Sequence, residues 1–388
     1  MPQQVSLGAE TAIEIEIALS AYAVGVLSAT ILAATFALST AWLSVALALH
    51  LPALGWIEGR VRIKVLRWLA LGVAIVVLLR LAANPYLVDY PISAPIFNWL
   101  LYGYGVPALA FIVATRQFGS RADDVLVGVL EAGSILFATL LLTFELRHGL
   151  YGRLAAPFSN LGRDALNPLV WLALAGFLLW LGERRHRPVL RWGGSILFGL
   201  ATTQVVLWQV LLANPLFTGE AVGRTIGFDV LILAYAVPAA IYAAIAARRL
   251  GPLPLRLIAR ILAAALTFIW VTLEIRHIFR GERLLWGSSS DAEWYAYSVA
   301  WLTFAGIGLA LGLLRRDEWL RRVSLAGIGL VVAKVFLSDM AELEGVLRAL
   351  SFLGLGGVLI GVGYAYRRLR PLQDDPGGEA MPLVQSKG

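Results

Sequence analysis

Long apolar segments follow one another along almost the whole chain, separated by short stretches that carry charge, proline or glycine. Hydrophobic residues make up 59% of the sequence and charged residues 15%, and the mean hydropathy is +0.76. Each helical crossing of a bilayer needs roughly 20 apolar residues, so the chain has room for about a dozen crossings joined by short loops. We therefore expect an all-α integral membrane protein, and a soluble enzyme is excluded.

Two features of the composition limit the chemistry. The chain has no cysteine, which excludes disulfides, thiolate metal sites and cysteine nucleophiles. The net charge of +7 comes mostly from arginine, which in a multi-pass protein determines topology before it indicates a polyanionic ligand. We expect no nucleic-acid partner and no cofactor.

The apolar segments predict about twelve transmembrane helices. Their expected ranges are 12–38, 41–57, 63–84, 96–115, 124–148, 166–182, 189–213, 228–247, 254–279, 294–314, 322–340 and 346–366. The following residues, 371–388, mix Pro, Gly, Asp and Gln with few hydrophobic side chains, and we expect a disordered cytoplasmic tail there.

The sequence also compares well with itself at a period of about 130 residues. Trp-Leu pairs begin the second helix of each third, at Trp42, Trp171 and Trp301, and Pro107 and Pro238 recur in matching Val-Pro-Ala segments. These recurrences predict three tandem four-helix repeats, which share one orientation because each has an even number of crossings. Their expected ranges are 1–120, 121–250 and 251–370.

Basic residues are concentrated in alternate loops of the predicted topology. Most of the 32 Lys and Arg residues fall on one side, as in the segments 184–191, 248–260 and 315–322. Because loops rich in Lys and Arg stay in the cytoplasm, both termini are expected on the cytoplasmic side.

A Glu-x-x-His pattern recurs in two of the three predicted copies, in Thr143–His148 and Thr272–His277. Arg and His suit the negative end of a helix dipole and reach the interface, but a carboxylate there opposes the dipole and needs a partner. The His one turn further along is the nearest candidate. The residues concerned are Glu145, Arg147 and His148 in one copy and Glu274, Arg276 and His277 in the other.

Two kinds of site fit this pattern. Glu-x-x-His on two helices is half of a di-iron site, but the further carboxylates that such a site needs do not recur at matching helical positions. We therefore expect no metal. A proton-linked Glu–His pair fits the same residues.

Polar residues recur near the outer end of the third helix of each copy. Gln209 and Asn214 align with Lys334 and Asp339, and Asn84 ends the corresponding helix of the first copy. An ionisable residue within a membrane span indicates function unless it reaches the interface. The partner candidates for Lys334 are Asp339, Glu274 and Glu145. On the inner half we expect an ion pair between Glu131 and Arg260.

The end of the chain resembles a known family. The residues that carry the resemblance are Arg321–Asp339, with Lys334 near its end, then Leu347–Gly356 with Arg348 and Ser351, and Tyr364–Arg368. They resemble the C-terminal portion of a large bacterial "predicted membrane protein" family of unknown function, best over residues 314–368. The resemblance implies a bacterial inner membrane and a role for the segment from Lys334 to Ser351, and it supplies no reaction.

Three classes of function stay open on these residues. The first is transport or flipping of a small or lipid-linked envelope solute, such as a saccharide, through a polar site on the outer face. The second is a non-catalytic membrane scaffold, and the third is an outer-face enzyme acting on an envelope lipid or saccharide. The expected site comprises Glu145, His148, Glu274, His277, Lys334 and Asp339, with Arg147, Arg276, Asn84, Gln209, Asn214 and Arg348 in support.

Overall fold

The computed structural model describes the central part of the chain and a few positions near its ends. The described ranges are 40–60, 65–82, 97–151, 161–287 and 289–335, with Ile63 and scattered positions in 18–36 and 353–364. These residues are helical apart from connecting turns and one isolated bridge between Ala221 and Arg283. The predicted all-α class is confirmed.

Twelve α-helices and three short π-helical segments make up the regular structure of the described residues. The α-helices are α2 (Thr40–Arg60), α3 (Val65–Ala82), α4 (Val106–Gly119), α5 (Val125–Tyr151), α6 (Leu161–Asp164), α7 (Leu166–Arg184), α8 (Pro188–Gln204), α9 (Pro215–Thr218), α10 (Val237–Ala247), α11 (Leu253–Arg280), α12 (Asp291–Leu314) and α13 (Glu318–Lys334). The π segments are η2 (Leu101–Gly105), η3 (Val205–Leu212) and η4 (Ile232–Ala236).

Five helical segments in the described ranges are long and apolar enough to cross a membrane. They are Val125–Leu150, Leu161–Arg184, Pro188–Thr218, Leu253–Arg280 and Asp291–Leu314. The other crossings of the predicted twelve stay predictions, and the predicted helices at 12–38 and 346–366 lie largely outside the described residues.

Two of the prolines inside helices lie just after a π-helical segment. Pro107 and Pro238 each follow a π segment, in which the Val106 amide donates to the Leu101 carbonyl and the Val237 amide to the Ile232 carbonyl. Proline has no amide hydrogen to donate to the carbonyl four residues earlier. In the π turn just before each proline, backbone amides donate to the carbonyl five residues earlier instead of four. The helix therefore continues past the proline rather than ending.

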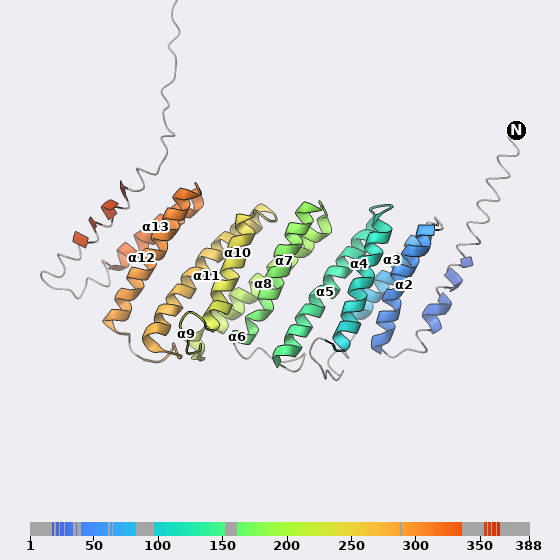
Figure 1. Ribbon diagram of the computed structural model, residues 1–388, viewed down its shortest axis with the longest axis horizontal. Coiled ribbons are helices and arrows are strands. Elements are labelled where there is room, and N and C mark those ends of the chain that lie inside the picture. Colours follow the sequence, from blue (N-terminus) through green and yellow to red (C-terminus); the bar gives the residue numbers. More distant parts are fainter. Residues whose placement is uncertain are drawn as a thin grey trace, which may run out of the picture. The chain divides into compact units, whose positions relative to one another are not determined.

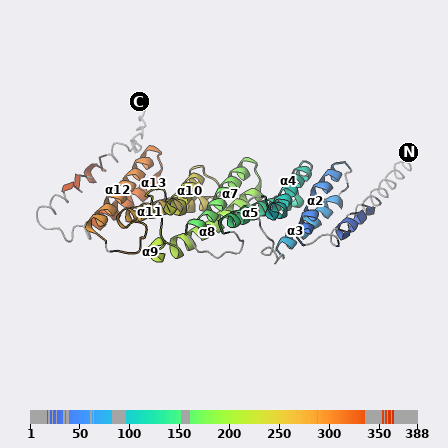
Figure 2. The same cartoon turned by 60° about the horizontal axis from the view of Figure 1, so that its bottom comes forward.

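The described helices belong to two compact units. Unit 1 comprises Met1–Glu220 and Phe228–Leu266, and unit 2 comprises Ala221–Gly227 and Thr267–Gly388, so α11 contributes to both. In unit 1, α2, α3, α4 and α5 pack together, and α7 packs against α5, α8 and α10 (Figure 1). In unit 2, α12 packs along α13, and the two helices also lie side by side in the second view (Figure 2).

The core of unit 1 fills the space between its first helices. Leu51, Phe111 and Phe118 are fully buried there, and the Phe111 and Phe137 rings pack with centroids 5.4 Å apart. Aromatic pairs in this geometry add to the dispersion energy that holds membrane helices together, because lipid offers no hydrophobic driving force between them.

Three helices, α7, α10 and α12, end in the same type of hydrogen-bonded turn. After α7, His186 has a φ of 53°, and the Arg187 amide donates to the Gly182 carbonyl over 3.0 Å. After α12, Arg316 repeats this φ and the Asp317 amide donates to Gly312 over 2.9 Å. After α10, Arg249 takes a φ of 54°. Each is a Schellman-type end with a non-glycine residue in the left-handed conformation.

Close packing of α7 on α8 requires glycine at one position of α8. A Cβ added to Gly194 would lie 3.0 Å from the Ala175 carbonyl oxygen and 3.0 Å from the Leu179 amide nitrogen. Both atoms belong to the backbone and cannot move aside without shifting α7. Small residues at helix contacts allow this approach of two backbones in membranes.

We expect Gly194→Ala to destabilise the protein by about 1–3 kcal/mol through overpacking between α7 and α8. Gly199→Ala on the same helix is the control, because nothing lies within 4 Å of a Cβ built there. Thermal unfolding of both variants in detergent measures the difference. Equal stability of the two variants would contradict the close contact.

Candidate functional site

The most buried of the predicted polar pairs lies at the end of α11 in unit 2. The Glu274 and His277 side chains are both buried, with His277 only 2% exposed. His277 Nδ1 lies 3.8 Å from Glu274 Oε2, and the Trp270 indole donates to Glu274 Oε1 over 3.2 Å. His277 Nε2 lies 3.0 Å from the Gly223 carbonyl oxygen. The structure therefore brings the predicted Glu and His side by side.

The contact with Gly223 indicates which ring nitrogen of His277 carries a hydrogen. A carbonyl oxygen only accepts, so His277 Nε2 must carry a hydrogen to bond to Gly223. Nδ1 then faces a carboxylate oxygen of Glu274 at 3.8 Å. The structure thus places a carboxylate beside an imidazole in a buried position.

The matching residues of α5 are arranged differently. Glu145 Oε2 accepts a hydrogen bond from the Asn98 amide over 3.1 Å, while the Asn98 carbonyl oxygen accepts from the Leu100 amide over 2.7 Å. His148 Nδ1 is buried without a hydrogen-bond partner among the described residues. The prediction that His148 is the partner of Glu145 was wrong, because Asn98 reaches Glu145 from the neighbouring segment.

Lys334 at the end of α13 bonds to α12. Its Nζ donates to the Ser298 hydroxyl over 2.7 Å and to the Trp294 carbonyl over 3.1 Å, and it lies 5.3 Å from the centroid of the Trp294 ring. Among the described residues Lys334 therefore contacts a hydroxyl, a carbonyl and an aromatic face, while Asp339, one of its predicted carboxylate partners, lies outside those residues.

A buried ion pair that sequence reasoning missed joins α11 to α12. Arg280 Nε lies 3.2 Å from Glu293 Oε2, with side chains 6% and 1% exposed. Tyr297 donates to Glu293 Oε1 over 2.8 Å, and Arg280 also donates to the Gly287 carbonyl over 2.7 Å. Both charges stand at the ends of helices joined by a short loop, a signal that the sequence contained.

The supporting residues have mainly structural contacts. Asn214 begins α9, where its Oδ1 accepts from the Leu216 amide over 3.0 Å. Arg276 donates to the Leu284 carbonyl over 2.7 Å. The Gln209 side chain is fully buried in η3, and both of its amide atoms lack partners among the described residues. Arg147 lies half-buried on α5. Asn84, Asp339 and Arg348 lie outside the described residues.

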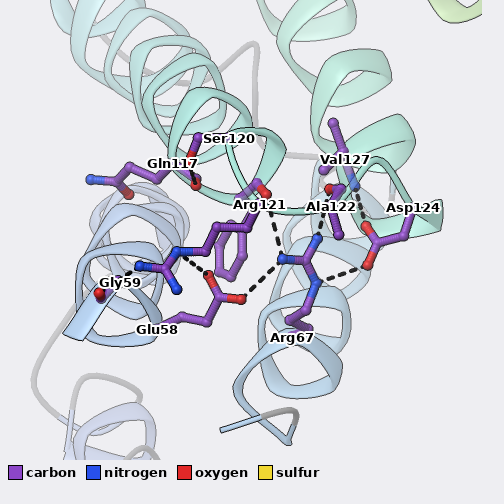
Figure 3. A network of polar contacts seen from close by, with 10 residues as sticks. Glu58, Gly59, Arg67, Gln117, Ser120, Arg121, Ala122, Asp124 and Val127 are labelled. Carbon is purple, nitrogen blue, oxygen red and sulfur yellow. Dashed lines mark hydrogen bonds and ion pairs between the residues drawn. The ribbon is translucent and has the colours of Figure 1, made fainter. Parts of the chain in front are cut away.

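An ion network lies at the other end of α5 from Glu145 and connects α2, α3 and the start of α5 (Figure 3). Arg67 of α3 lies 3.0 Å from Glu58 of α2 and 2.8 Å from Asp124, which precedes α5. Arg121 donates to the Gly59 carbonyl over 2.6 Å and flanks Glu58 on its other side at 3.8 Å. The hydrogen bond from Arg67 lowers the pKa of the Asp124 carboxyl below its ordinary value.

A second ion network lies at the start of α8. Arg187 Nη1 lies 2.6 Å from Asp123 Oδ2, and its Nε lies 2.8 Å from Glu131 Oε1. Arg187 donates both hydrogen bonds, and the one to Asp123, followed by the one to Glu131, raises the pKa of the Arg187 guanidinium. The predicted partner of Glu131, Arg260, was wrong, because α5 packs against α8 and Arg187 directly precedes that helix.

The buried ion pairs described above each join segments of a single unit. A helical chain with several segments long enough to cross a bilayer, and with its buried charges paired inside the protein, is a multi-pass membrane protein. The profile of the family described as "Predicted membrane protein (DUF2339)" matches residues 6–369, and the chain belongs to this family of unknown function. Comparison with curated proteins found no match, and neither did comparison with solved structures.

We expect Arg280→Met to destabilise the protein by about 3–5 kcal/mol, because it leaves Glu293 charged and buried without its partner. Arg224→Met is the matched control, since Arg224 pairs with Glu282 at 2.7 Å but is 91% exposed, and such pairs contribute about 0–1 kcal/mol. Chemical unfolding in detergent measures both.

The double variant Arg280→Met, Glu293→Leu tests the cause of the loss. Removing both charges should restore much of the stability, because an apolar pair needs no compensation in a buried site. A loss in Arg280→Met no larger than in Arg224→Met would contradict the buried pair.

The lowered pKa of Asp124 predicts a loss of stability in acid. Its ion pair stabilises the fold fully above the unfolded carboxyl pKa of about 3.9 and stops doing so as the pH falls through the lowered folded pKa. Asp124→Asn should therefore be less stable than the parent at pH 7, with a gap that closes toward pH 3. Asp291→Asn, at an exposed site, is the control, and parallel curves for parent and Asp124→Asn would contradict the prediction.

Proposed function

We propose that the protein is a non-catalytic membrane scaffold composed of three tandem four-helix copies, with the copies at 1–120, 121–250 and 251–370. In such arrays each copy packs against its neighbours, and the array presents an extended surface to partners. The proposal rests on contacts that recur along the chain and on the use of polar side chains within those contacts.

One recurring contact carries the proposal. The Trp171 indole donates to the Thr143 hydroxyl over 2.8 Å, and the Trp301 indole donates to the Thr272 hydroxyl over 3.1 Å. The donors are 130 residues apart and the acceptors 129 apart, which matches the period of the sequence. In both cases a Trp is held by a long helix that comes earlier in the chain, Trp171 of α7 by α5 and Trp301 of α12 by α11, which supports a common four-helix plan.

The helix ends define the register between copies. The turns at His186 and Arg316 are alike and 130 residues apart, which aligns Lys334 with Gln204. Sequence comparison aligned Lys334 with Gln209 instead. The two alignments differ because polar side chains recur in this region at more than one spacing. The turn occurs once at the end of each helix, so it allows only one alignment.

In this register, polar residues of the three copies each link the third helix of a copy to the helix before it. Gln204 accepts a hydrogen bond from Asn167 over 2.8 Å, which links the third helix of the second copy to the helix before it. Lys334 bonds in the same way to Ser298. In the first copy Arg80 donates to Ser44 over 3.1 Å. Side chains that hold helices to one another in this way favour a scaffold over a substrate site.

A second candidate function is proton-linked transport of a small or lipid-linked solute. The observation that favours it is the buried Glu274–His277 pair, in which a carboxylate oxygen and an imidazole nitrogen lie 3.8 Å apart at the end of α11. Helix packing by itself does not require a titratable pair, and such pairs inside membrane proteins often belong to proton pathways.

Reconstituted protein distinguishes the two candidates. Proteoliposomes that contain a pH-sensitive dye report proton flux across external pH 5.5 to 8, for the parent and for the double variant His148→Ala, His277→Ala. The scaffold predicts the flux of empty liposomes for both proteins. A pH-dependent flux in the parent that the correctly folded variant loses would contradict the scaffold and support transport.

The repeated contact is tested by stability. Trp171→Phe and Trp301→Phe should each destabilise the protein by about 1 kcal/mol through loss of one hydrogen bond. Trp192→Phe is the control, because Trp192 is 71% exposed. If only one of the two Trp variants lost stability, the common plan would be contradicted.

A further inference from the structure

An apolar groove runs between α7 and α10 on the surface of unit 1. Its volume is about 660 Å³, and small residues such as Gly176, Ala240 and Ala244 line it beside the larger Phe177 and Trp180. Phe177 is 52% exposed and Trp180 37% exposed, so the groove is open along its aromatic side. From Leu172 to Trp180 it follows α7 for about 12 Å at the rise of an α-helix.

The groove leads to a group of arginines. Arg248 lines one end of it, where α7 and α10 both finish. The Gly251 amide donates to Glu183 Oε1 over 2.7 Å, which ties the two helix ends together. Arg184, Arg185 and Arg249 lie on the same turns and are exposed.

These arginines are not neutralised by the part of the chain that the structure describes. Arg248, Arg185 and Arg249 form no side-chain hydrogen bond or ion pair with the described residues, and Arg184 stacks 5.4 Å from the centroid of the Trp180 ring. Arg67 and Arg187 in unit 1 are each held by two carboxylates instead. The group beside the groove is therefore a concentration of free positive charge.

We propose that this groove binds an anionic phospholipid, with an acyl chain along the small residues of α7 and α10 and the phosphate at Arg248. An apolar channel that ends in exposed guanidinium groups complements a molecule with an apolar chain and an anionic head. A second helix of protein would cover the apolar surface but would leave the arginines unpaired unless it carried matching carboxylates. On the orientation that the basic loops predict, the site faces the cytoplasmic leaflet.

Native mass spectrometry of the full chain in detergent tests the site, with dioleoylphosphatidylglycerol and dioleoylphosphatidylcholine as probes. The parent should retain the anionic lipid more strongly than the zwitterionic one. Arg248→Gln and Arg184→Gln should each weaken retention of the anionic lipid about fivefold, since a basic residue near an anionic lipid surface contributes about that much. Retention of the zwitterionic lipid should change little.

Two controls separate the site from general attraction to basic residues. Arg60→Gln removes an exposed arginine that stacks 4.8 Å from the centroid of the Trp56 ring at the end of α2, an arrangement like that of Arg184 and Trp180. Arg315→Gln removes one at the end of α12. Both should retain the anionic lipid as the parent does.

A variant that leaves all arginines in place tests the acyl-chain part of the groove. Ala240→Phe fills the groove and should weaken retention of both lipids. Circular dichroism and size-exclusion chromatography establish that each variant is folded. Equal retention of the two lipids by the parent, an equal loss in Arg60→Gln and Arg248→Gln, or unchanged retention in Ala240→Phe would each overturn the proposal. So would a change of oligomeric state in Ala240→Phe without a change in lipid retention, because the groove would then hold a second copy.

Discussion

Inside a bilayer no water is available to satisfy a buried polar group, and most of the arrangement in this protein follows from that constraint. The backbone meets it by being helical in the described ranges, apart from connecting turns and the bridge between Ala221 and Arg283. Side chains meet it through partners on adjoining segments. Arg280 pairs with Glu293, Lys334 donates to Ser298, and Asn98 reaches Glu145. Each of these contacts satisfies a polar group and joins two segments of the chain, so charged and polar residues of the kinds used in catalysis here hold the fold together.

The helices tolerate residues that would end them elsewhere, because backbone groups released at one point are satisfied nearby. The π segments before Pro107 and Pro238 keep their helices continuous. The π segment around Gln209 exposes its carbonyl to the Tyr235 hydroxyl, which donates to it over 2.6 Å. Gly194 contributes through its lack of a side chain, because it allows the backbones of α7 and α8 to meet where a Cβ would hold them apart.

Arginine has two distinct uses at the basic end of unit 1. Arg67 and Arg187 are surrounded by carboxylates and join helices that are distant in sequence, which makes them part of the fold. Arg248 and its neighbours lie beside an apolar groove without such partners, which leaves their charge available to something outside the chain. Composition and the count of basic loops treat these residues alike. Only the partners in space separate a structural arginine from one that is available to a ligand.

The sequence by itself determined the all-helical class and the order of the helices in the described ranges, because these depend on hydropathy along the chain. It also singled out Glu274 and His277, which share a helix face and meet for that reason. The tertiary structure decided every partner that comes from another segment: Asn98 for Glu145, Arg187 for Glu131, and Ser298 for Lys334. Periodicity determines which residues share a face of one helix, whereas the packing of helices determines which faces meet, and that depends on side-chain shape at contacts far apart in the chain.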